Sequence, residues 1–489
     1  MTGQASPTGD IPTEELIREG RAVLEWIGRY LDNPEQYPVL SQVRPGEIRA
    51  SLDAAPPEQP EPIDAIIRDF ETKIVPGITH WNHPGFFGYF ATSSSVPGIL
   101  GEMLTAALDV KAMLWRTSPA ATELEQVVTD WLRQMLGMST AWFGITTDTA
   151  SISSMLALAA AREAKPELEI RERGMAGRPD LPRLRVYASP HAHSSVDKAA
   201  LALGLGLENV VKIADDEEFR MRPDALARAI AADRASGFLP LACVATVGTT
   251  SMSSIDPVPP IAEICRRENV WLHVDGAYGG TLAIVPEYRN ILDGVELADS
   301  LVVNPHKWLF TPFDCSVFYV KHPEVLKRAF SLVAEYLVTR DDDVVNYMDY
   351  GVQLGRRFRA LKLWMVIRAF GTVGLVERLR AHCALARQFA AWVQGSDDWK
   401  LMAPVPFSLV CFRYAPGGMS DAECDRVNEA IMHRVNSGGE VFLSHTKLGG
   451  RYTLRLAIGN IRTAERHIAL AWERLRSSIG SSDTVVPDK

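Results

Sequence analysis

Short apolar runs alternate with segments of helical periodicity through the middle of the chain, and this alternation restricts the fold more than any other feature. Six runs rich in apolar and β-branched residues predict strands at residues 185–188, 209–213, 241–247, 270–274, 300–303 and 315–320. Helical patterns lie between them, for example at 194–203, 223–232 and 259–267. Strands that alternate with helices build a mostly parallel sheet covered on both faces, so the sequence predicts an α/β fold.

The N-terminal part of the chain predicts a thin helical segment. Residues 1–13 are expected to be a tail, and residues 14–95 hold helical patterns at 14–32 and 63–75, separated by a proline-rich stretch. These helices have apolar faces but too little mass for a core of their own. We therefore expect the 14–95 segment to pack on another body, for example a partner subunit.

The C-terminal part predicts a small α+β domain. The expected large domain spans residues 96–375 and closes with a long helical region near 358–380. The expected small domain spans 376–489, with helices at 381–394, 422–436 and 464–477 and strands at 408–414 and 453–457.

Composition removes several classes of function. The chain has 51 basic and 60 acidic residues, a formal net charge of −9, which gives no electrostatic footprint for nucleic acid or for a membrane surface. The longest apolar stretch, near 155–161, is far too short to span a bilayer, and the first residues have no pattern of a secretory signal. The six cysteines are scattered without a CxxC pair, which favours reduced thiols and a cytoplasmic location.

Polar residues follow four of the expected strands at the point where each strand ends. The four segments are Ala192-His193-Ser194-Ser195, Gly248-Thr249-Thr250, Asp275-Gly276-Ala277-Tyr278 and Asn304-Pro305-His306-Lys307-Trp308. Ligands of open α/β sheets bind outside the carboxyl ends of the strands. The sequence therefore predicts a functional site at this edge of the sheet.

Asp275 and Lys307 give this edge a specific chemistry. Taken alone, Asp275 could be a structural ion pair or a helix cap, and Lys307 could be a surface lysine. A carboxylate and a desolvated lysine on neighbouring strand ends are, however, what a pyridoxal phosphate site requires. The lysine binds the cofactor aldehyde covalently, and the carboxylate keeps the pyridine nitrogen protonated.

A helix N-terminus is available for the phosphate of such a cofactor. Thr149 and Ser151 precede or open a helical pattern that extends to residue 163, where free N–H groups and hydroxyls suit a dianion. The alternative is an ordinary N-cap. His193 could stack on the cofactor ring; His191 and His193 could instead bind a metal, but no third ligand lies at a readable spacing.

Together, these motifs resemble those of the group II pyridoxal-phosphate-dependent amino acid decarboxylases, and most of all the aromatic-L-amino-acid decarboxylases. The resemblance extends over nearly the whole chain. It includes Asn304-Pro305-His306-Lys307-Trp308, His273-Val274-Asp275-Gly276-Ala277-Tyr278, Ala192-His193-Ser194-Ser195-Val196, Thr79-His80-Trp81, Ser118-Pro119-Ala120-Ala121-Thr122 and Leu354-Gly355-Arg356-Arg357-Phe358-Arg359.

The resemblance implies an aspartate-aminotransferase-like fold (fold type I) and a homodimer with shared active sites. It also implies roles for individual residues. Lys307 resembles the lysine that binds the cofactor, and Asp275 resembles the partner of the pyridine nitrogen. Ala277 and His193 resemble the residues on the two faces of the ring, and Thr246 resembles a residue near the ring and the substrate carboxylate.

Further roles follow from the same resemblance. The residues that resemble the phosphate contacts are Thr149, Ala150, Ser151, Asn304 and His306. Tyr336 resembles the tyrosine that returns a proton to the substrate carbon, and its presence favours a decarboxylase over the aldehyde synthases of the family.

The resemblance also implies a pocket for the substrate side chain, lined by Trp81, Tyr89, Phe90, Thr92, Met113 and Gly355. These side chains suit an aromatic ring. Gly355 leaves space that favours an indole or phenol over an imidazole. Lys111 and Met113 stand where similar family members carry apolar and aromatic residues, which bears on the ring preference.

The expected function is pyridoxal-phosphate-dependent decarboxylation of an aromatic L-amino acid such as Trp, Tyr, Phe or DOPA. The product would be the arylalkylamine, with release of carbon dioxide. Alternatives on the same fold are an aromatic aldehyde synthase, an aminotransferase, or a decarboxylase of histidine or glutamate. A catalytically silent homologue that serves as a scaffold is a further alternative, but it would be expected to lack Lys307 or Tyr336.

Overall fold

A seven-stranded sheet forms the centre of the molecule in the computed structural model, which describes residues 9–332 and 344–480. The strand order is β1-β7-β6-β5-β4-β2-β3, and β7 alone runs antiparallel to its two neighbours. The strands are β1 (Phe143–Thr147), β2 (Leu184–Ala188), β3 (Val210–Lys212), β4 (Leu239–Thr246), β5 (Trp271–Asp275), β6 (Ser300–Val303) and β7 (Ser316–Val320). The sheet is mostly parallel, as the alternating pattern predicts.

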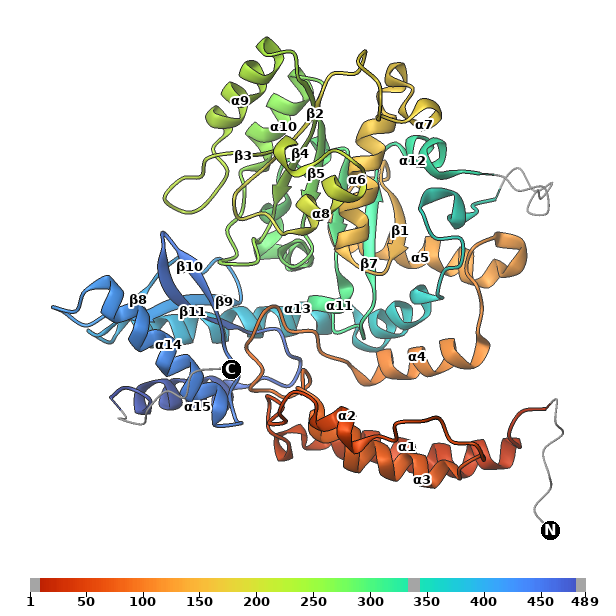
Figure 1. Ribbon diagram of the computed structural model, residues 1–489, viewed down its shortest axis with the longest axis vertical. Coiled ribbons are helices and arrows are strands. Elements are labelled where there is room, and N and C mark those ends of the chain that lie inside the picture. Colours follow the sequence, from red (N-terminus) through yellow and green to blue (C-terminus); the bar gives the residue numbers. More distant parts are fainter. Residues whose placement is uncertain (1–8, 333–343, 481–489) are drawn as a thin grey trace.

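Helices cover both faces of this sheet (Figure 1). One face packs on α6 (Ala150–Glu163), α8 (Ser195–Ala202) and α12 (Pro323–Phe330). The other packs on α5 (Pro119–Met135), α9 (Pro223–Ala235), α10 (Val258–Arg267) and the first half of α13 (Arg359–Gln394). Successive residues of β4 belong to opposite cores, Ala242 to the first and Cys243 to the second, because side chains alternate along a strand.

A second, antiparallel sheet lies beside the first. Its order is β10-β11-β9-β8, built from β8 (Trp399–Leu401), β9 (Leu409–Tyr414), β10 (Ser444–Leu448) and β11 (Arg451–Ala457). The second half of α13 packs on it with α14 (Asp421–Ser437) and α15 (Glu465–Ser477). These elements form an α+β unit, here called the small domain.

Two details of the sequence-based expectation are wrong. The sequence predicts separate helices near 358–380 and 381–394, whereas α13 continues through this point and departs from helical geometry only at Gly371, where φ is +62°. Because α13 runs through residue 376, it joins the two sheets, and the boundary expected there stays a prediction. Strand β1 was not predicted at all.

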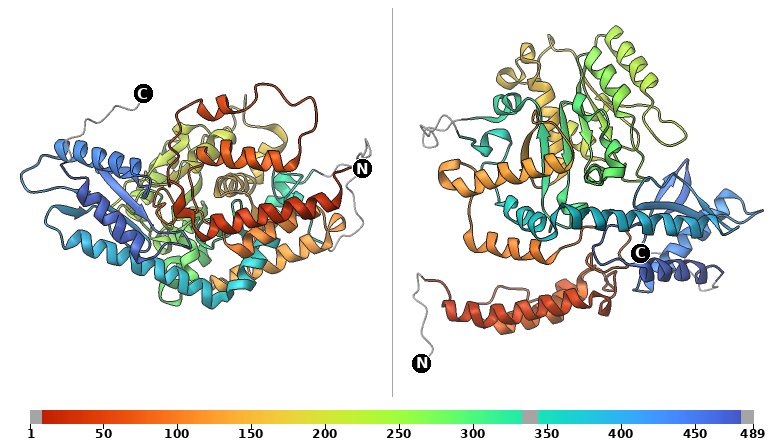
Figure 2. Two further views of the ribbon diagram at one scale, coloured as in Figure 1. Left: turned by 90° about the horizontal axis from the view of Figure 1, so that it is seen from below. Right: turned by 180° about the vertical axis from the view of Figure 1, so that it is seen from behind.

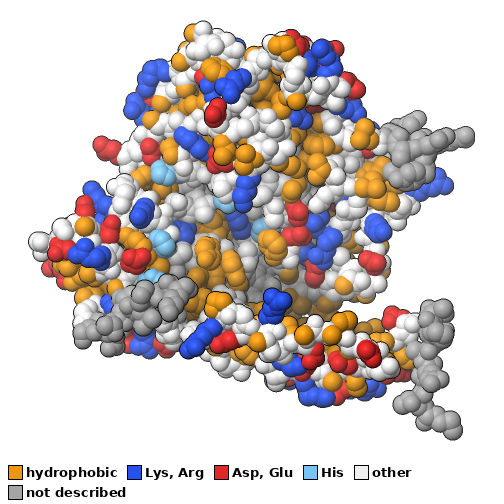
Figure 3. Space-filling view, viewed as in Figure 1, with side chains coloured by type: hydrophobic (Ala, Val, Ile, Leu, Met, Phe, Trp, Pro, Cys, Tyr) orange, Lys and Arg blue, Asp and Glu red, His pale blue; other side chains and the backbone are white. Residues whose placement is uncertain are grey.

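The N-terminal helices extend away from the rest of the molecule (Figures 1 and 2). They are α1 (Thr13–Asp32), α2 (Glu47–Ser51) and α3 (Ile63–Asp69), which continues as a π-helical turn at Phe70–Ile74, and they bury no residue. In the space-filling view, hydrophobic side chains are spread along these helices and across the hollow above them (Figure 3). This agrees with the expectation that the segment lacks its own core.

Two findings relate to composition. The six cysteines are all buried and free of disulfides. Among residues 9–332 and 344–480, no helix has both the length and the apolar character needed to cross a bilayer.

Candidate active site

The ends of three adjacent parallel strands bring the predicted site residues to one edge of the large sheet. Thr246 is the last residue of β4 and pairs in register with Asp275, the last residue of β5. Asp275 in turn pairs with Val302 of β6, and the short helix α11 (Pro305–Trp308), which follows β6, carries Lys307. Lys307 therefore lies at the same edge as Asp275.

Three ionisable groups at this edge are close enough to influence one another. Burial lowers the pKa of Lys307 below its usual 10.5, and the Asp275 carboxylate partly offsets this shift. Burial also lowers the pKa of His193, with opposing contributions from the charges of Asp275 and Lys307. The structure thus brings together the lysine, the carboxylate and the imidazole that the sequence singles out.

The loop after β5 turns Asp275 towards Ala277. The Ala277 N–H donates to Asp275 Oδ1 at 3.1 Å. Ala277 also packs with Ala150, the first residue of α6, and with Val302 in a small buried cluster. A ring-face residue and a phosphate-side residue predicted from separate motifs are therefore in contact.

The predicted phosphate contacts Thr149, Ala150 and Ser151 lie at the N-terminus of α6. Thr149 is the N-cap, Ala150 is buried, and Ser151 is exposed in the first turn. Free N–H groups at a helix N-terminus and the helix dipole favour a phosphate there. The Asp148 carboxylate accepts from the Thr149 N–H at 2.6 Å, so the acidic residue of this loop already has a partner.

Asn304 and His306 follow β6 and are both buried. Ser316 Oγ donates to Asn304 Oδ1 at 2.6 Å, and Ser316 Oγ lies 3.5 Å from Ser153 Oγ of α6. His306 Nδ1 accepts from the Cys315 N–H at 2.9 Å, and burial lowers its pKa to about 3. The His306 ring is therefore neutral near pH 7.

The Thr246 hydroxyl shows that this edge can receive a polar ligand. Thr246 is 3% exposed, and its Oγ1 has no hydrogen-bond partner among the described residues. Buried hydroxyl groups normally have partners. An unpaired hydroxyl beside Asp275, together with a partly buried lysine and a free helix N-terminus, fits the polar groups of pyridoxal phosphate.

The alternative of a metal site has no support from His191. Its Nε2 lies 2.8 Å from Asp215 Oδ2, in a hydrogen bond that takes up one of the two ring nitrogens. Within the described part of the chain, no group of three or more His, Cys, Asp or Glu side chains is arranged to hold a metal ion.

Aromatic side chains lie next to Lys307. Lys307 Nζ is 5.5 Å from the centre of the Phe90 ring. Phe90 stacks on Tyr278 with ring centres 3.8 Å apart, and Tyr278 stacks on Trp308 at 4.6 Å. Phe90, predicted to line the substrate pocket, is thus part of a rigid stack that also contains the neighbour of Lys307.

Trp81 and Tyr89 form a second aromatic group with a partner that the sequence analysis missed. The rings of Trp81 and Phe86 stack at 4.4 Å, and Tyr89 lies 5.9 Å from Phe442 of the small domain. Tyr89 is exposed and has a φ of +53°, which a non-glycine residue adopts only when its surroundings hold it there. Thr92 lies two residues after Phe90 and is half-buried.

Met113 and Gly355 lie beside each other in a different place. Ala112, next to Met113, exchanges hydrogen bonds with Arg356, next to Gly355. No described contact joins either residue to Lys307 of the same chain. Tyr336 lies outside the described residues.

Arg455 of β11 is a buried cation that the sequence analysis also missed. Its guanidinium is 5.8 Å from the Phe90 ring and donates to the carbonyls of Thr250 and Ser251 and to the Ser444 hydroxyl. All these acceptors are neutral, so the charge has no acidic partner among the described residues. A single arginine in a strand of alternating polar and apolar residues does not indicate that its side chain is buried near the site.

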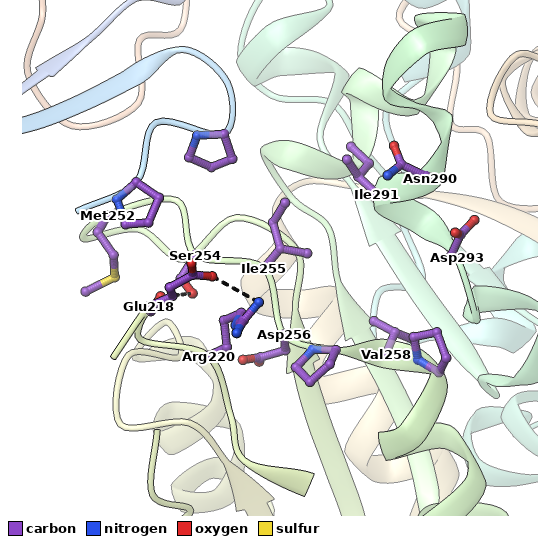
Figure 4. Close-up of a pocket in the computed structure, with 14 residues that line it drawn as sticks. Glu218, Arg220, Met252, Ser254, Ile255, Asp256, Val258, Asn290, Ile291 and Asp293 are labelled. Carbon is purple, nitrogen blue, oxygen red and sulfur yellow. Dashed lines mark hydrogen bonds and ion pairs between the residues drawn. The ribbon is translucent and has the colours of Figure 1, made fainter. Parts of the chain in front are cut away.

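A separate cavity of about 310 Å³ lies behind the end of β4, between the loop of residues 252–259 and the small domain (Figure 4). Asp256 lines it, but its carboxylate accepts from the N–H groups of Thr246 and Met221 at 2.8 and 2.7 Å. Burial raises the pKa of Asp256 to about 6. Asp256 therefore supports the strand end that carries Thr246.

Comparison with known proteins agrees with this geometry. The conserved domain of pyridoxal-dependent decarboxylases matches residues 45–415. The chain is 40% identical to tryptophan decarboxylase 2 of Oryza sativa subsp. japonica, covering 95% of this chain and 94% of the relative. It is 42% identical to tyrosine decarboxylase 2 of Arabidopsis thaliana, covering 94% of this chain and 86% of the relative.

Two further comparisons bear on cofactor and reaction. The crystal structure of Oryza sativa TDC with PLP and tryptamine superposes with a TM-score of 0.92 at 35% identity, covering 97% of this chain and 99% of that one. Phenylacetaldehyde synthase of Arabidopsis thaliana is 39% identical over 94% of this chain and 95% of its own length. The expected fold type is confirmed by the first of these, and both reactions weighed from the sequence occur among the relatives.

Proposed function

Because the chain belongs to the pyridoxal-dependent decarboxylase family, we propose that it decarboxylates an aromatic L-amino acid to the arylalkylamine and carbon dioxide, with pyridoxal 5'-phosphate as cofactor. The observation that carries this proposal is the juxtaposition of Lys307 and Asp275 on adjacent strand ends, with the unpaired Thr246 hydroxyl beside them. Relatives named as tryptophan and tyrosine decarboxylases support the substrate class.

Lys307 and Asp275 would perform the central tasks. The lowered pKa of Lys307 increases the fraction of neutral amine, the form that can bond to the cofactor aldehyde. Asp275 would hold a proton on the pyridine nitrogen. When bound, the cofactor supplies an electron-accepting ring that stabilises the electron pair left behind when carbon dioxide departs.

The neighbouring residues would position the cofactor and keep water out. His193 would cover one ring face, while buried Ala277 would pack on the other. The α6 N-terminus, with Thr149, Ala150 and Ser151, would bind the phosphate. Asn304 and His306 would support it from below.

The substrate would meet aromatic walls and a buried cation. Phe90, whose ring centre lies 5.5 Å from Lys307 Nζ, and the group of Trp81 and Tyr89 offer flat apolar surfaces for an indole or phenol ring. Arg455 would provide a positive charge for the substrate carboxylate. Tyr336 would return the proton to the substrate carbon, a role that rests on the sequence resemblance.

An aldehyde synthase is the second candidate, favoured by the 39% identity to phenylacetaldehyde synthase. The two reactions differ in their products, because oxidative deamination releases ammonia and hydrogen peroxide in addition to carbon dioxide. Assays of amine, peroxide and ammonia on one substrate therefore separate them.

The proposal is tested by incubating the holoenzyme with Trp, Tyr, Phe, DOPA, His and Glu and quantifying the amine from each. We expect amine from one or more of the four aromatic substrates and little from His or Glu. Amine from Glu or His alone would refute the aromatic specificity. A stoichiometric yield of peroxide and aldehyde would assign the chain to the synthases.

We also infer a homodimer with shared active sites. Helix α4 (Val96–Leu108) packs on α13 through Gly101 and on Pro312 through Gly98, but its opposite side exposes Val96, Leu100 and Leu104. The N-terminal helices expose further large apolar side chains, among them Leu16, Ile17, Leu24 and Ile66. Faces of this size in one molecule mark protein–protein contacts.

A dimer would also explain why no described contact joins Met113 or Gly355 to Lys307 of the same chain. Leu104→Glu should convert the dimer to a monomer in sedimentation analysis and reduce activity. Leu207→Glu, an equally exposed leucine remote from α4 in the chain, is the control. A monomeric parent enzyme with full activity would refute the shared site. The cytoplasmic location stays a prediction.

A further inference from the structure

Glu125 of α5 and Arg356 form a bidentate ion pair in the interior of the protein. Arg356 Nη2 donates to Glu125 Oε1 at 2.6 Å and Nη1 donates to Oε2 at 3.1 Å. The Arg356 side chain is 5% exposed and the Glu125 side chain is 1% exposed. A buried pair of this kind adds little net stability compared with apolar residues, but it fixes the geometry of whatever it contacts.

The pair holds the outer edge of β1 at Thr146. Because β1 is an edge strand, the polar backbone groups on this side have no neighbouring strand. The Thr146 N–H donates to Glu125 Oε1 at 2.8 Å, and Arg356 Nη2 donates to the Thr146 carbonyl at 2.7 Å. Thr146 lies three residues before Thr149, so the pair sets where the proposed phosphate loop begins.

The same guanidinium holds the segment that contains Met113. Arg356 Nη1 donates to the Ala112 carbonyl at 2.9 Å, and the Ala112 N–H donates back to the Arg356 carbonyl at 2.9 Å. The Arg356 guanidinium also lies 4.7 Å from the centre of the Tyr347 ring, which restricts its orientation. Gly355 is the residue directly before Arg356.

A second contact ties the same segment to the phosphate loop. Gln353 Nε2 donates to Asp148 Oδ2 at 3.4 Å, and Asp148 Oδ1 accepts from the Thr149 N–H. Residues 353–356 therefore contact the end of β1 at Thr146 and the loop before α6 at Asp148. They contact the 112–113 segment at a third point.

We propose that Glu125 and Arg356 are positioning residues that couple the phosphate-binding loop to the substrate-lining residues Met113 and Gly355. The proposal rests on the proposed function. In this arrangement neither side chain touches substrate or cofactor. Loss of the pair would shift two elements at the same time, the loop that binds the phosphate and the surface that binds the substrate ring.

The test compares Glu125→Gln, which keeps the shape of the side chain and removes its charge, with a matched control. The control is Asp425→Asn in the small domain. It removes the carboxylate that lies 2.8 Å from a second buried arginine, Arg413. Four quantities are measured for each holoenzyme: the rate of cofactor loss on dilution, the unfolding temperature, and KM and kcat at saturating cofactor.

We expect both variants to unfold at lower temperature. Only Glu125→Gln should lose cofactor faster, by about tenfold or more, the factor that one charge-assisted hydrogen bond represents. It should also raise KM more than it lowers kcat. Asp425→Asn should stay within about twofold of the parent in the rate of cofactor loss and in KM, because a lost hydrogen bond to the cofactor would change them by more than about twofold.

Arg356→Lys provides a second variant if Glu125→Gln does not fold. Arg356→Lys keeps the charge opposite Glu125 but cannot form the bidentate pair. It should therefore lose cofactor faster than the parent. Where Glu125→Gln folds, Arg356→Lys should lose cofactor more slowly than Glu125→Gln. Cofactor retention and KM within twofold of the parent in every folded variant would overturn the proposal. If the parent forms no arylalkylamine, the proposed function fails, while the cofactor-loss rates still test the pair.

Discussion

Replacing Thr246 by valine should change the stability of the cofactor-free protein and the affinity for the cofactor in opposite directions. Valine keeps the branched shape of threonine at the end of β4 and removes only the hydroxyl. In the structure, this hydroxyl is buried beside Asp275 and lacks a partner among the described residues. The protein without cofactor therefore carries the cost of an unpaired polar group.

The magnitudes follow from this geometry. An unsatisfied buried hydroxyl costs about 1–3 kcal/mol, so Thr246→Val should stabilise the cofactor-free protein by an amount in that range. A hydrogen bond to the cofactor contributes about 0.5–1.5 kcal/mol, so its loss should weaken cofactor affinity roughly two- to tenfold.

Thermal unfolding of cofactor-free protein and titration with pyridoxal phosphate measure the two effects. The control is Thr453→Val in β11, a buried threonine whose hydroxyl donates to the Arg451 carbonyl at 3.1 Å. The control should lower stability by about 1 kcal/mol, because it removes a satisfied hydrogen bond, and leave cofactor affinity unchanged.

Two results would refute the reasoning. If Thr246→Val destabilises the cofactor-free protein as much as Thr453→Val does, the Thr246 hydroxyl has a partner in solution. If the affinity for pyridoxal phosphate does not change, the Thr246 hydroxyl does not contact the cofactor, and the proposed position of the cofactor is wrong.

Four further predictions concern the proposed roles. Lys307→Ala should reduce turnover below detection while some cofactor stays bound without a covalent bond; borohydride treatment followed by mass spectrometry should find no attached cofactor, and normal turnover would remove Lys307 from the mechanism. Asp275→Asn should lower kcat by about 10²–10³-fold, because the amide carries no charge to hold the ring proton, and an unchanged kcat would contradict this role. Since burial lowers the pKa of Lys307 below 10.5, covalent capture of pyridoxal phosphate should accelerate as pH rises with a midpoint below pH 10.5, which rapid mixing at stepped pH can follow; a midpoint at or above 10.5 would argue against a desolvated amine. Tyr336→Phe should keep substrate binding but divert product from amine to aldehyde, and an unchanged amine yield would exclude Tyr336 as the proton donor.

Local patterns were sufficient for the central sheet and for the core of the site. Apolar runs predict the positions of β4, β5 and β6 to within two residues, because the pattern of a strand is visible in neighbouring residues of the sequence. Asp275 and Lys307 were found for the same reason, since Asp275 ends β5 and Lys307 lies in the short helix that follows β6. Parallel strands then necessarily bring their carboxyl ends to one edge.

Elements that depend on distant partners were not predictable in this way. Strand β1 is five residues long, contains Gly144, and pairs only with β7, about 170 residues later in the chain. The break in α13 falls at Gly371, a residue that propensity alone does not distinguish from other helical glycines.

Residue pairs far apart in sequence were decided by the tertiary structure alone. Glu125 and Arg356 are 231 positions apart, and Phe442 reaches Tyr89 from the small domain. The sequence determined which chemical groups stand at the strand ends, because that order is local. Packing of the two domains and the N-terminal segment decided which side chains surround those groups, because burial brings together surfaces that the chain order keeps apart.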